Sequence, residues 1–139
     1  MIPAFKLEVT TPDGQVYSKD VDMVTLPGIE GEMGILPMHA PLIAQLGDGQ
    51  IIARRGNEED HLLVTGGCAE ITQDRVAILT IFATATSAID ETKAEEARAR
   101  AEARLNEKIS PDEAALVQAS LTHAVSQLKY KRRGHHGHH

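Results

Sequence analysis

Two carboxylates and a histidine, Glu30, Glu32 and His39, lie close together in sequence among the glycines and prolines of residues 28–42. Side chains of these types can transfer protons in catalysis or bind a metal ion. A two-carboxylate mechanism needs a fixed distance between the groups, and a glycine-rich segment offers nothing that fixes it. We therefore expect neither catalysis nor a metal site here.

Large apolar side chains lie between these charged groups and close to them, including Met33, Ile35, Leu36 and Met38. Glycine adopts backbone conformations that other residues avoid, and proline lacks a backbone donor, so we expect no regular helix or strand. An irregular loop that exposes apolar groups between acidic ones usually contacts another molecule. Alternatively, the apolar residues fold back onto the core of the protein, and composition leaves both possibilities open.

No catalytic motif stands out elsewhere in the sequence. Gly66 and Gly67 lack the lysine and hydroxyl residue that follow in a phosphate-binding loop, and there is no nucleophile elbow or HExxH motif. Cys68 is the single cysteine, so no intramolecular disulfide can form, and we expect it to be buried. Histidines at positions 135, 136, 138 and 139 could chelate a metal ion, but a solvated tail is the simpler interpretation.

The composition limits the possible partners. The net charge is −6 and aromatic residues make up 3% of the chain with no Trp, which argues against nucleic-acid binding. Residues 1–88 carry a net charge of −7 and residues 89–139 a net charge of +1, so the two parts should have different surfaces. No window approaches the ~20 apolar residues that span a bilayer, and we expect a cytoplasmic chain without a signal peptide.

The first part of the chain has the pattern of short strands. Phe5, Leu7 and Val9 alternate with polar residues, which is the period of a half-buried strand. Seven further runs, separated by turn residues, cover 15–18, 22–26, 42–46, 51–54, 61–65, 69–72 and 76–80. This spacing predicts an antiparallel β-sandwich or barrel, followed by a joint over residues 82–88.

The second part has the pattern of two helices. Asp90 is a suitable N-cap for a helix to about Lys108, and Ser110, Pro111 and Glu113 form a capping box for a second helix to about Tyr130. Their apolar stripes are mainly alanine, so the helices should pack closely and antiparallel with a small buried area. We therefore predict an α+β, mostly β, fold: a β-sandwich domain over residues 1–86 and a mobile helical hairpin over residues 87–139.

Three sequence motifs together resemble one protein family. They are residues 30–37 (EGEMGILP), 39–42 (HAPL) and 66–70 (GGCAE), and Ile89-Asp90 then opens the helical part. In this order and spacing they resemble the epsilon subunit of bacterial F-type ATP synthases. The resemblance covers nearly the whole chain.

The resemblance implies a non-catalytic rotor subunit in the central stalk, which takes part in proton-driven ATP synthesis. Members of the family bind the gamma subunit and rest on the ring of c subunits. Their helical hairpin can extend toward the alpha/beta catalytic hexamer, where it restrains ATP hydrolysis. The implied location is the cytoplasmic face of the bacterial inner membrane, with membrane association only through the complex.

The resemblance also implies two sets of contact residues. Glu32, Met33, Ile35 and His39 match positions at or near the c-ring contact. For His39, a local hydrogen bond that holds the loop is an equally good interpretation. The basic end of the second helix would bind acidic surfaces on the hexamer, or simply complement the helix dipole; its residues are Lys129, Lys131, Arg132 and Arg133.

Some family members bind ATP weakly on the folded hairpin. Ile89 and Asp90 match that motif, but Lys93 replaces an arginine, while Arg100 matches an arginine of the first helix. On the second helix, two further arginines are replaced, by His123 and Gln127. Lysine lacks the planar fork that binds phosphate through two hydrogen bonds. We therefore expect weak or no nucleotide binding and no cofactor.

Two other classes of function remain open from the residues alone. A small-molecule binding protein would have a deep polar pocket in the strand region, with the hairpin as a lid. A free-standing metalloenzyme would need several inward histidines on strands, and the strand region contains only His39 and His61.

Overall fold

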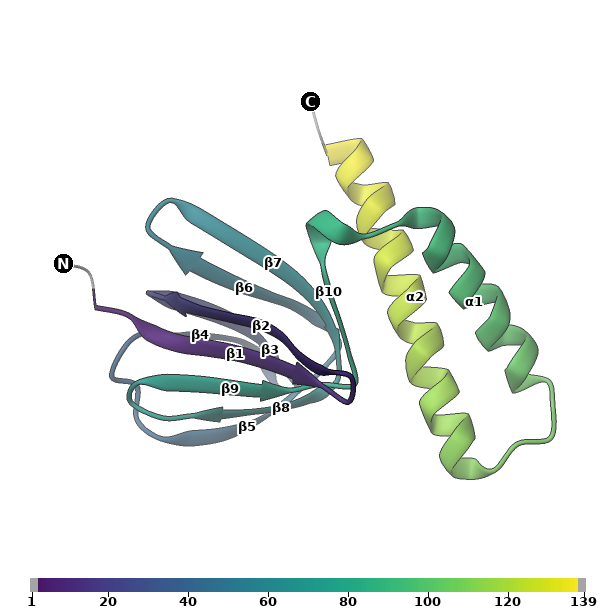
Figure 1. Cartoon of the computed structure of the whole chain (residues 1–139), viewed down its shortest axis with the longest axis horizontal. Coiled ribbons are helices and arrows are strands. Elements are labelled where there is room, and N and C mark those ends of the chain that lie inside the picture. The colour runs from purple at the N-terminus through teal and green to yellow at the C-terminus, as the bar shows by residue number, and fades with distance from the viewer. Residues whose placement is uncertain (1–2, 138–139) are drawn as a thin grey trace. The chain divides into compact units, whose positions relative to one another are not determined.

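The computed structural model describes residues 3–137, with side chains described up to residue 133. The chain divides into two compact units, Met1–Ala85 and Thr86–His139 (Figure 1). The first consists of strands and the second of helices.

Within the described residues, the first unit contains ten strands. They are β1 (Phe5–Thr11), β2 (Gly14–Val21), β3 (Met23–Gly28), β4 (Gly31–Ile35), β5 (Leu42–Leu46), β6 (Gly49–Arg55), β7 (Glu58–Thr65), β8 (Gly67–Ile71), β9 (Arg75–Leu79) and β10 (Phe82–Ala85). Their order is β10-β7-β6-β3-β5-β8-β9-β1-β2, and β4 pairs with β3 beside this path. The predicted sandwich is confirmed. The expectation of purely antiparallel pairing is corrected by one pair, β1 with β9, which is parallel. These two strands are distant in sequence, so no tight hairpin forces them to be antiparallel.

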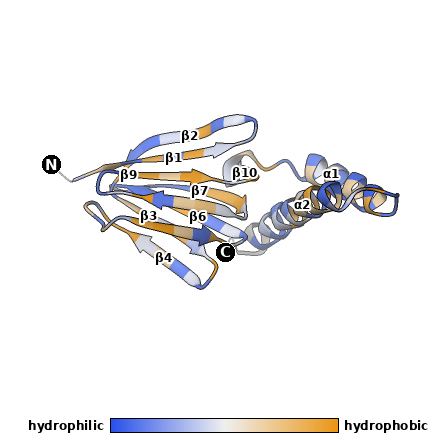
Figure 2. Ribbon diagram, turned by 90° about the horizontal axis from the view of Figure 1, so that it is seen from below, coloured by the Kyte–Doolittle hydropathy of each residue, from blue (hydrophilic) through white to orange (hydrophobic). Residues whose placement is uncertain are grey.

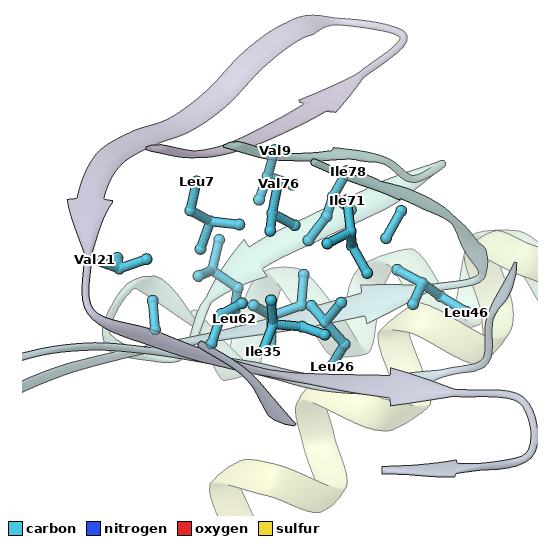
Figure 3. Packing of buried hydrophobic residues seen from close by; sticks show 14 of the residues in the cluster. Leu7, Val9, Val21, Leu26, Ile35, Leu46, Leu62, Ile71, Val76 and Ile78 are labelled. Carbon is cyan, nitrogen blue, oxygen red and sulfur yellow. The ribbon is translucent and has the colours of Figure 1, made fainter. Parts of the chain in front are cut away.

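The core lies between the two layers of the sheet. Figure 3 shows Leu7 and Val76 of one layer pointing toward Leu26 and Ile35 of the other, and all four are fully or almost fully buried. Aliphatic side chains dominate this core, and hydrophobic segments run along β3, β7 and β9 (Figure 2). The period-two alternation of β1 is confirmed, because Phe5, Leu7 and Val9 are buried.

Three further expectations about the strand region were wrong. Residues 31–35 form a strand, because Gly31 takes φ 136° after the turn and lets the chain pair back along β3. Residues 82–85, predicted as part of the joint, pair with β7 as strand β10. Cys68 is exposed, because Ala69 and Ile71 occupy the inward face of β8 and Cys68 alternates with them.

The second unit contains a 3₁₀ turn (Thr86–Ala88) and two helices, α1 (Glu91–Leu105) and α2 (Pro111–Gly137). The predicted cap at Asp90 is confirmed, since its side chain accepts from the backbone N–H of Lys93 at 3.1 Å. Helix α1 ends three residues earlier than predicted, and α2 continues seven residues beyond Tyr130. Ser110 caps α2 as predicted, since its hydroxyl accepts from the Glu113 N–H at 3.1 Å. The Glu113 carboxylate binds Arg104, where the predicted capping box would have it accept from the backbone N–H of Ser110.

The two helices contact each other along small side chains. The buried positions on α1 are Ala94 and Ala101, and the buried apolar ones on α2 are Ala124 and Leu128. Over residues 3–137, neither helix combines the length and the apolar character needed to cross a membrane.

Candidate partner-binding site

A hollow of about 470 Å³ lies beside the turn that joins β3 to β4. Its walls are residues 28–33, from the turn and the start of β4, and residues 42–45, from β5. Backbone contacts hold these two segments together: Ile29 N–H donates to the Gln45 carbonyl at 3.1 Å, and Gly47 N–H donates to the Pro27 carbonyl at 2.8 Å. The hollow is therefore fixed by the sheet itself. We call it the hairpin hollow.

The hairpin hollow combines apolar walls with acidic groups. Ile29 and Ile43 are 58% and 76% exposed, which is unusual for large aliphatic side chains. Glu30 and Glu32 stand exposed beside them. A concave apolar surface with polar groups around it has the composition of a contact site for another protein.

The structure separates the four residues that were expected at the c-ring contact. Glu32 and Met33 line the hairpin hollow, and Met33 also packs partly against the core. Ile35 is only 1% exposed and belongs to the core, so its side chain supports the β3–β4 pair instead of facing a partner. This expectation for Ile35 is therefore corrected. The period-two rule explains it, since Met33 and Ile35 both face inward along β4.

His39 lies outside the hairpin hollow. Its Nδ1 is 2.7 Å from the carbonyl oxygen of Ala40. A carbonyl only accepts hydrogen bonds, so Nδ1 carries a proton and donates it. This geometry agrees with the local, loop-holding interpretation of the histidine. The preceding Met38 has a positive φ of 64°, and its N–H donates to the Gln73 carbonyl at 3.0 Å, so this connection has a defined shape.

Sequence reasoning missed Ile29, Leu42 and Ile43 as lining residues. A signal was present: Leu42 and Ile43 are adjacent large aliphatic residues in a strand, and adjacent side chains point to opposite faces. At least one of them must therefore point away from any single core. Ile29 lies beside Leu42 and Ile43 because Gly28 pairs with Leu46, and this pairing is not visible in the sequence.

The basic end of α2 is exposed at all four predicted positions, Lys129, Lys131, Arg132 and Arg133. The pKa of Glu95 on α1 is lowered, mainly by its hydrogen bond from Arg98 and to a smaller extent by the charge of Arg132. Arg132 therefore lies near the first turns of α1. The C-terminal histidine side chains lie outside the described residues.

The candidate nucleotide residues lie far apart along α1. Asp90 is already engaged as the helix cap, and Ile89 is buried. Lys93 is exposed near the first turn, while Arg100 follows ten residues after Asp90, about 15 Å along the helix. Arg100 lines a groove of about 460 Å³ between the two helices. The structure therefore does not bring Asp90 and Arg100 together around one phosphate-sized site.

The other arginine in this groove is already paired. Arg104 donates from Nε and Nη2 to one oxygen of Glu113, at 2.9 and 2.7 Å, and from Nη1 to Glu107. These contacts, led by the bond to Glu113, raise the pKa of Arg104. An anion entering the groove would have to compete with two carboxylates for this guanidinium.

A polar cluster ties β2 to β7 within the sandwich. Asp60 accepts from the Tyr17 hydroxyl at 2.7 Å and from Lys19 Nζ at 3.0 Å. These bonds, led by the one from Tyr17, lower the pKa of Asp60, while burial and the Asp60 carboxylate raise the pKa of Tyr17. The groups satisfy one another, so the cluster joins strands. Among the residues with described positions, no group of three or more His, Cys, Asp or Glu could hold a metal ion.

Comparison with known families accounts for both units. The model of the ATP synthase Delta/Epsilon chain beta-sandwich domain matches residues 4–86. The model of the long alpha-helix domain of the same chain matches residues 87–131.

Individual proteins are similar to this chain over almost its full length. An ATP synthase epsilon chain of Dehalococcoides mccartyi is 46% identical over 133 residues, covering 94% of this chain and 95% of the relative. A chain in the cryo-EM structure of the Euglena gracilis mitochondrial ATP synthase, described as OSCP/F1/c-ring, is 28% identical with a TM-score of 0.64, covering 95% of this chain and 83% of that one. A chain of the Tetrahymena thermophila mitochondrial central stalk/c-ring structure has a TM-score of 0.57 and covers 89% and 96%. At 13% identity this last match shows the fold alone. The chain therefore belongs to the ATP synthase Delta/Epsilon chain family, as an epsilon-type subunit that is itself non-catalytic.

Proposed function

We propose that the sandwich joins the gamma subunit to the membrane-embedded c ring in the central stalk of a bacterial ATP synthase, as a peripheral subunit. Family membership and the likeness to a chain of an F1/c-ring assembly support this position. The main support for a contact with the c ring is the hairpin hollow, whose apolar walls are exposed and whose shape is held by backbone hydrogen bonds. A preorganised surface of this kind binds without a large ordering cost.

Within this proposal, a polar loop of a c subunit places an apolar side chain against Ile29 and Ile43. Glu32 then accepts hydrogen bonds from the loop and fixes its register. Met33 supports the floor of the hollow, since it packs against the core. His39 shapes the neighbouring connection through its bond to Ala40.

The second part of the proposal concerns the helical hairpin over residues 87–139. We propose that it restrains ATP hydrolysis by moving toward the alpha/beta hexamer about a joint near residue 86. The exposed basic end at Lys129, Lys131, Arg132 and Arg133 supplies cations for an acidic surface there. Nucleotide has little part in this control, because Lys93 offers no guanidinium fork and Arg100 lies far from the Asp90 cap.

The ring contact is tested with the double variant Glu32→Ala, Ile43→Ser in the full chain. An anchor side chain at the centre of an interface contributes about 2 kcal/mol or more, so F1 containing the variant should bind stripped membranes at least roughly thirtyfold more weakly. Val16→Ser is the matched control, because Val16 is also an exposed aliphatic residue but lies on β2, outside the hollow. Equal binding by the double variant and the control would refute the assignment of the hollow.

The regulatory part is tested by hydrolysis assays on complexes assembled with a chain that lacks residues 89–139. Removing the hairpin should raise ATP hydrolysis while assembly is retained. A full-length chain with glutamine at the four basic positions should shift hydrolysis in the same direction. Unchanged hydrolysis in both complexes would exclude a restraining role for the hairpin.

A further inference from the structure

One arginine bridges the connection between the two helices. Arg104 lies in the last turn of α1, Glu107 lies in the connection, and Glu113 lies in the first turn of α2. The guanidinium donates from Nε and Nη2 to Glu113 Oε2 at 2.9 and 2.7 Å, and from Nη1 to Glu107. A single side chain thus links α1, the connection and α2.

Small side chains make up much of the remaining interface between the helices. The buried apolar positions are mostly alanines, which remove little apolar area from water. Arg98, six residues earlier on α1, forms ion pairs with Glu95 and Glu102 on its own helix. Charge-assisted bonds from an arginine to a carboxylate are stronger and more directional than neutral ones. The Arg104–Glu113 contact is therefore placed to decide whether the helices stay together.

We propose that Arg104 and Glu113 form a salt-sensitive clasp that holds α1 and α2 closed as a hairpin and sets how often they separate. The side chains are 46% and 41% exposed, so dissolved ions reach the pair and screen it. An exposed pair of this kind changes a two-state ratio by up to about fivefold. Its consequence for ATP hydrolysis rests on the proposed function, but the clasp itself is a property of the isolated chain.

The clasp is tested by the reactivity of a buried thiol. In the full chain with Cys68→Ser, a cysteine is introduced at Ala101, which is 5% exposed in the helix interface. Its rate of reaction with a thiol reagent is proportional to the fraction of separated helices, even when this fraction is small. A second chain with the cysteine at Ala94 reports on the other end of the interface.

Arg104→Gln should speed the reaction at both positions by up to about fivefold. Arg98→Gln is the matched control, because Arg98 and Arg104 lie three residues on either side of Ala101 and carry the same charge. The control should change the rate much less, since the ion pairs of Arg98 with Glu95 and Glu102 stay within α1. The charge swap Arg104→Glu with Glu113→Arg should return the rate toward that of the wild type.

Salt supplies an independent arm of the test. Raising the salt to about 1 M should speed the reaction in the wild type and leave the Arg104→Gln variant almost unchanged. Equal rates in the two arginine variants, no recovery in the charge swap, or faster reaction at Ala101 without any change at Ala94 would each overturn the clasp. Unchanged hydrolysis by a complex that carries an open clasp would instead count against the proposed function.

Discussion

Among the glycines of the strand region, Gly67 leaves the least room for a side chain. Its φ is +120°, and a Cβ added there would lie 2.1 Å from the carbonyl oxygen of Leu79 and 3.0 Å from the Cα of Thr80. The obstacle is the backbone of β9 and the residue after it, which cannot rotate away as a side chain would. We therefore predict that Gly67→Ala lowers the free energy of unfolding of the sandwich through two separate effects.

The first effect is backbone strain, since an L-residue held at this φ costs about 1–3 kcal/mol. The second is overpacking, which typically costs a further ~1–3 kcal/mol. The sum, about 2–6 kcal/mol, is a large part of the roughly 5–15 kcal/mol that stabilises a typical domain. Gly31→Ala separates the two effects, because Gly31 has φ +136° and a Cβ added there would meet nothing within 4 Å. This control should show the strain alone.

The measurement is urea unfolding of the full chain, followed by far-ultraviolet circular dichroism and extrapolated to water. Gly67→Ala should be less stable than Gly31→Ala by about 1–3 kcal/mol. Stabilities within about 0.5 kcal/mol of each other would refute the close approach of β8 and β9 as the reason for this glycine. The same result would reopen the question of why the residue 66–70 motif begins with two glycines.

Two further predictions concern polar contacts in the sandwich. Tyr17→Phe removes the hydroxyl that donates to Asp60 at 2.7 Å and should lower the free energy of unfolding by about 1 kcal/mol at pH 7. This is a small value for a hydrogen bond to a carboxylate, because Asp60 is 42% exposed and water screens the bond. The folded-state pKa of Asp60 is lowered, so this stabilisation is present above the ordinary Asp pKa of about 4 and is lost as the pH falls through the folded-state pKa. The free energies of unfolding of the wild type and Tyr17→Phe should therefore converge in acid. A difference in stability that stays constant with pH would contradict this origin. Thr80→Val should cost about 1–3 kcal/mol, because the buried Thr80 hydroxyl lies 2.8 Å from the Gly66 carbonyl and 3.1 Å from that of Thr65. Thr80→Ser keeps the hydroxyl and should lose less in the same urea titration, and a loss as large as that of Thr80→Val would contradict the hydroxyl as the main origin of the effect.

The parts of the fold that were predictable are those fixed by local spacing. Phe5, Leu7 and Val9 alternate because one face of β1 is buried, and Asp90 and Ser110 can cap helices with their own side chains. The strand at residues 31–35 was not predictable from its composition. Glycine weakens a strand in isolation, but here the turn at Gly31 and the partner strand β3 supply the pairing.

The site was only partly predictable, because its walls come from segments that meet through pairing. Glu32 and Met33 were expected at the c-ring contact and line the hollow, whereas Ile29 and Ile43 were not expected there. Ile35 was also expected at that contact, but its side chain faces the core. The Arg104–Glu113 contact spans nine residues across a turn. Residues nine positions apart do not face each other on one helix, so this contact can be inferred only after the two helices are known to pack against each other.

The two units differ in what resists their deformation. Large aliphatic side chains such as Leu7 and Leu26 pack against one another between the layers of the sandwich, and separating the layers would expose this whole core to water. Separating α1 from α2 exposes mainly alanine positions and breaks an ion pair that salt already weakens. A modest change in partner contacts can therefore open the hairpin while the sandwich keeps its shape, since a ligand shifts a two-state element only by its differential affinity for the two states. This difference in resistance is what the proposed function requires, namely a stiff link in the sandwich and a movable restraint in the hairpin.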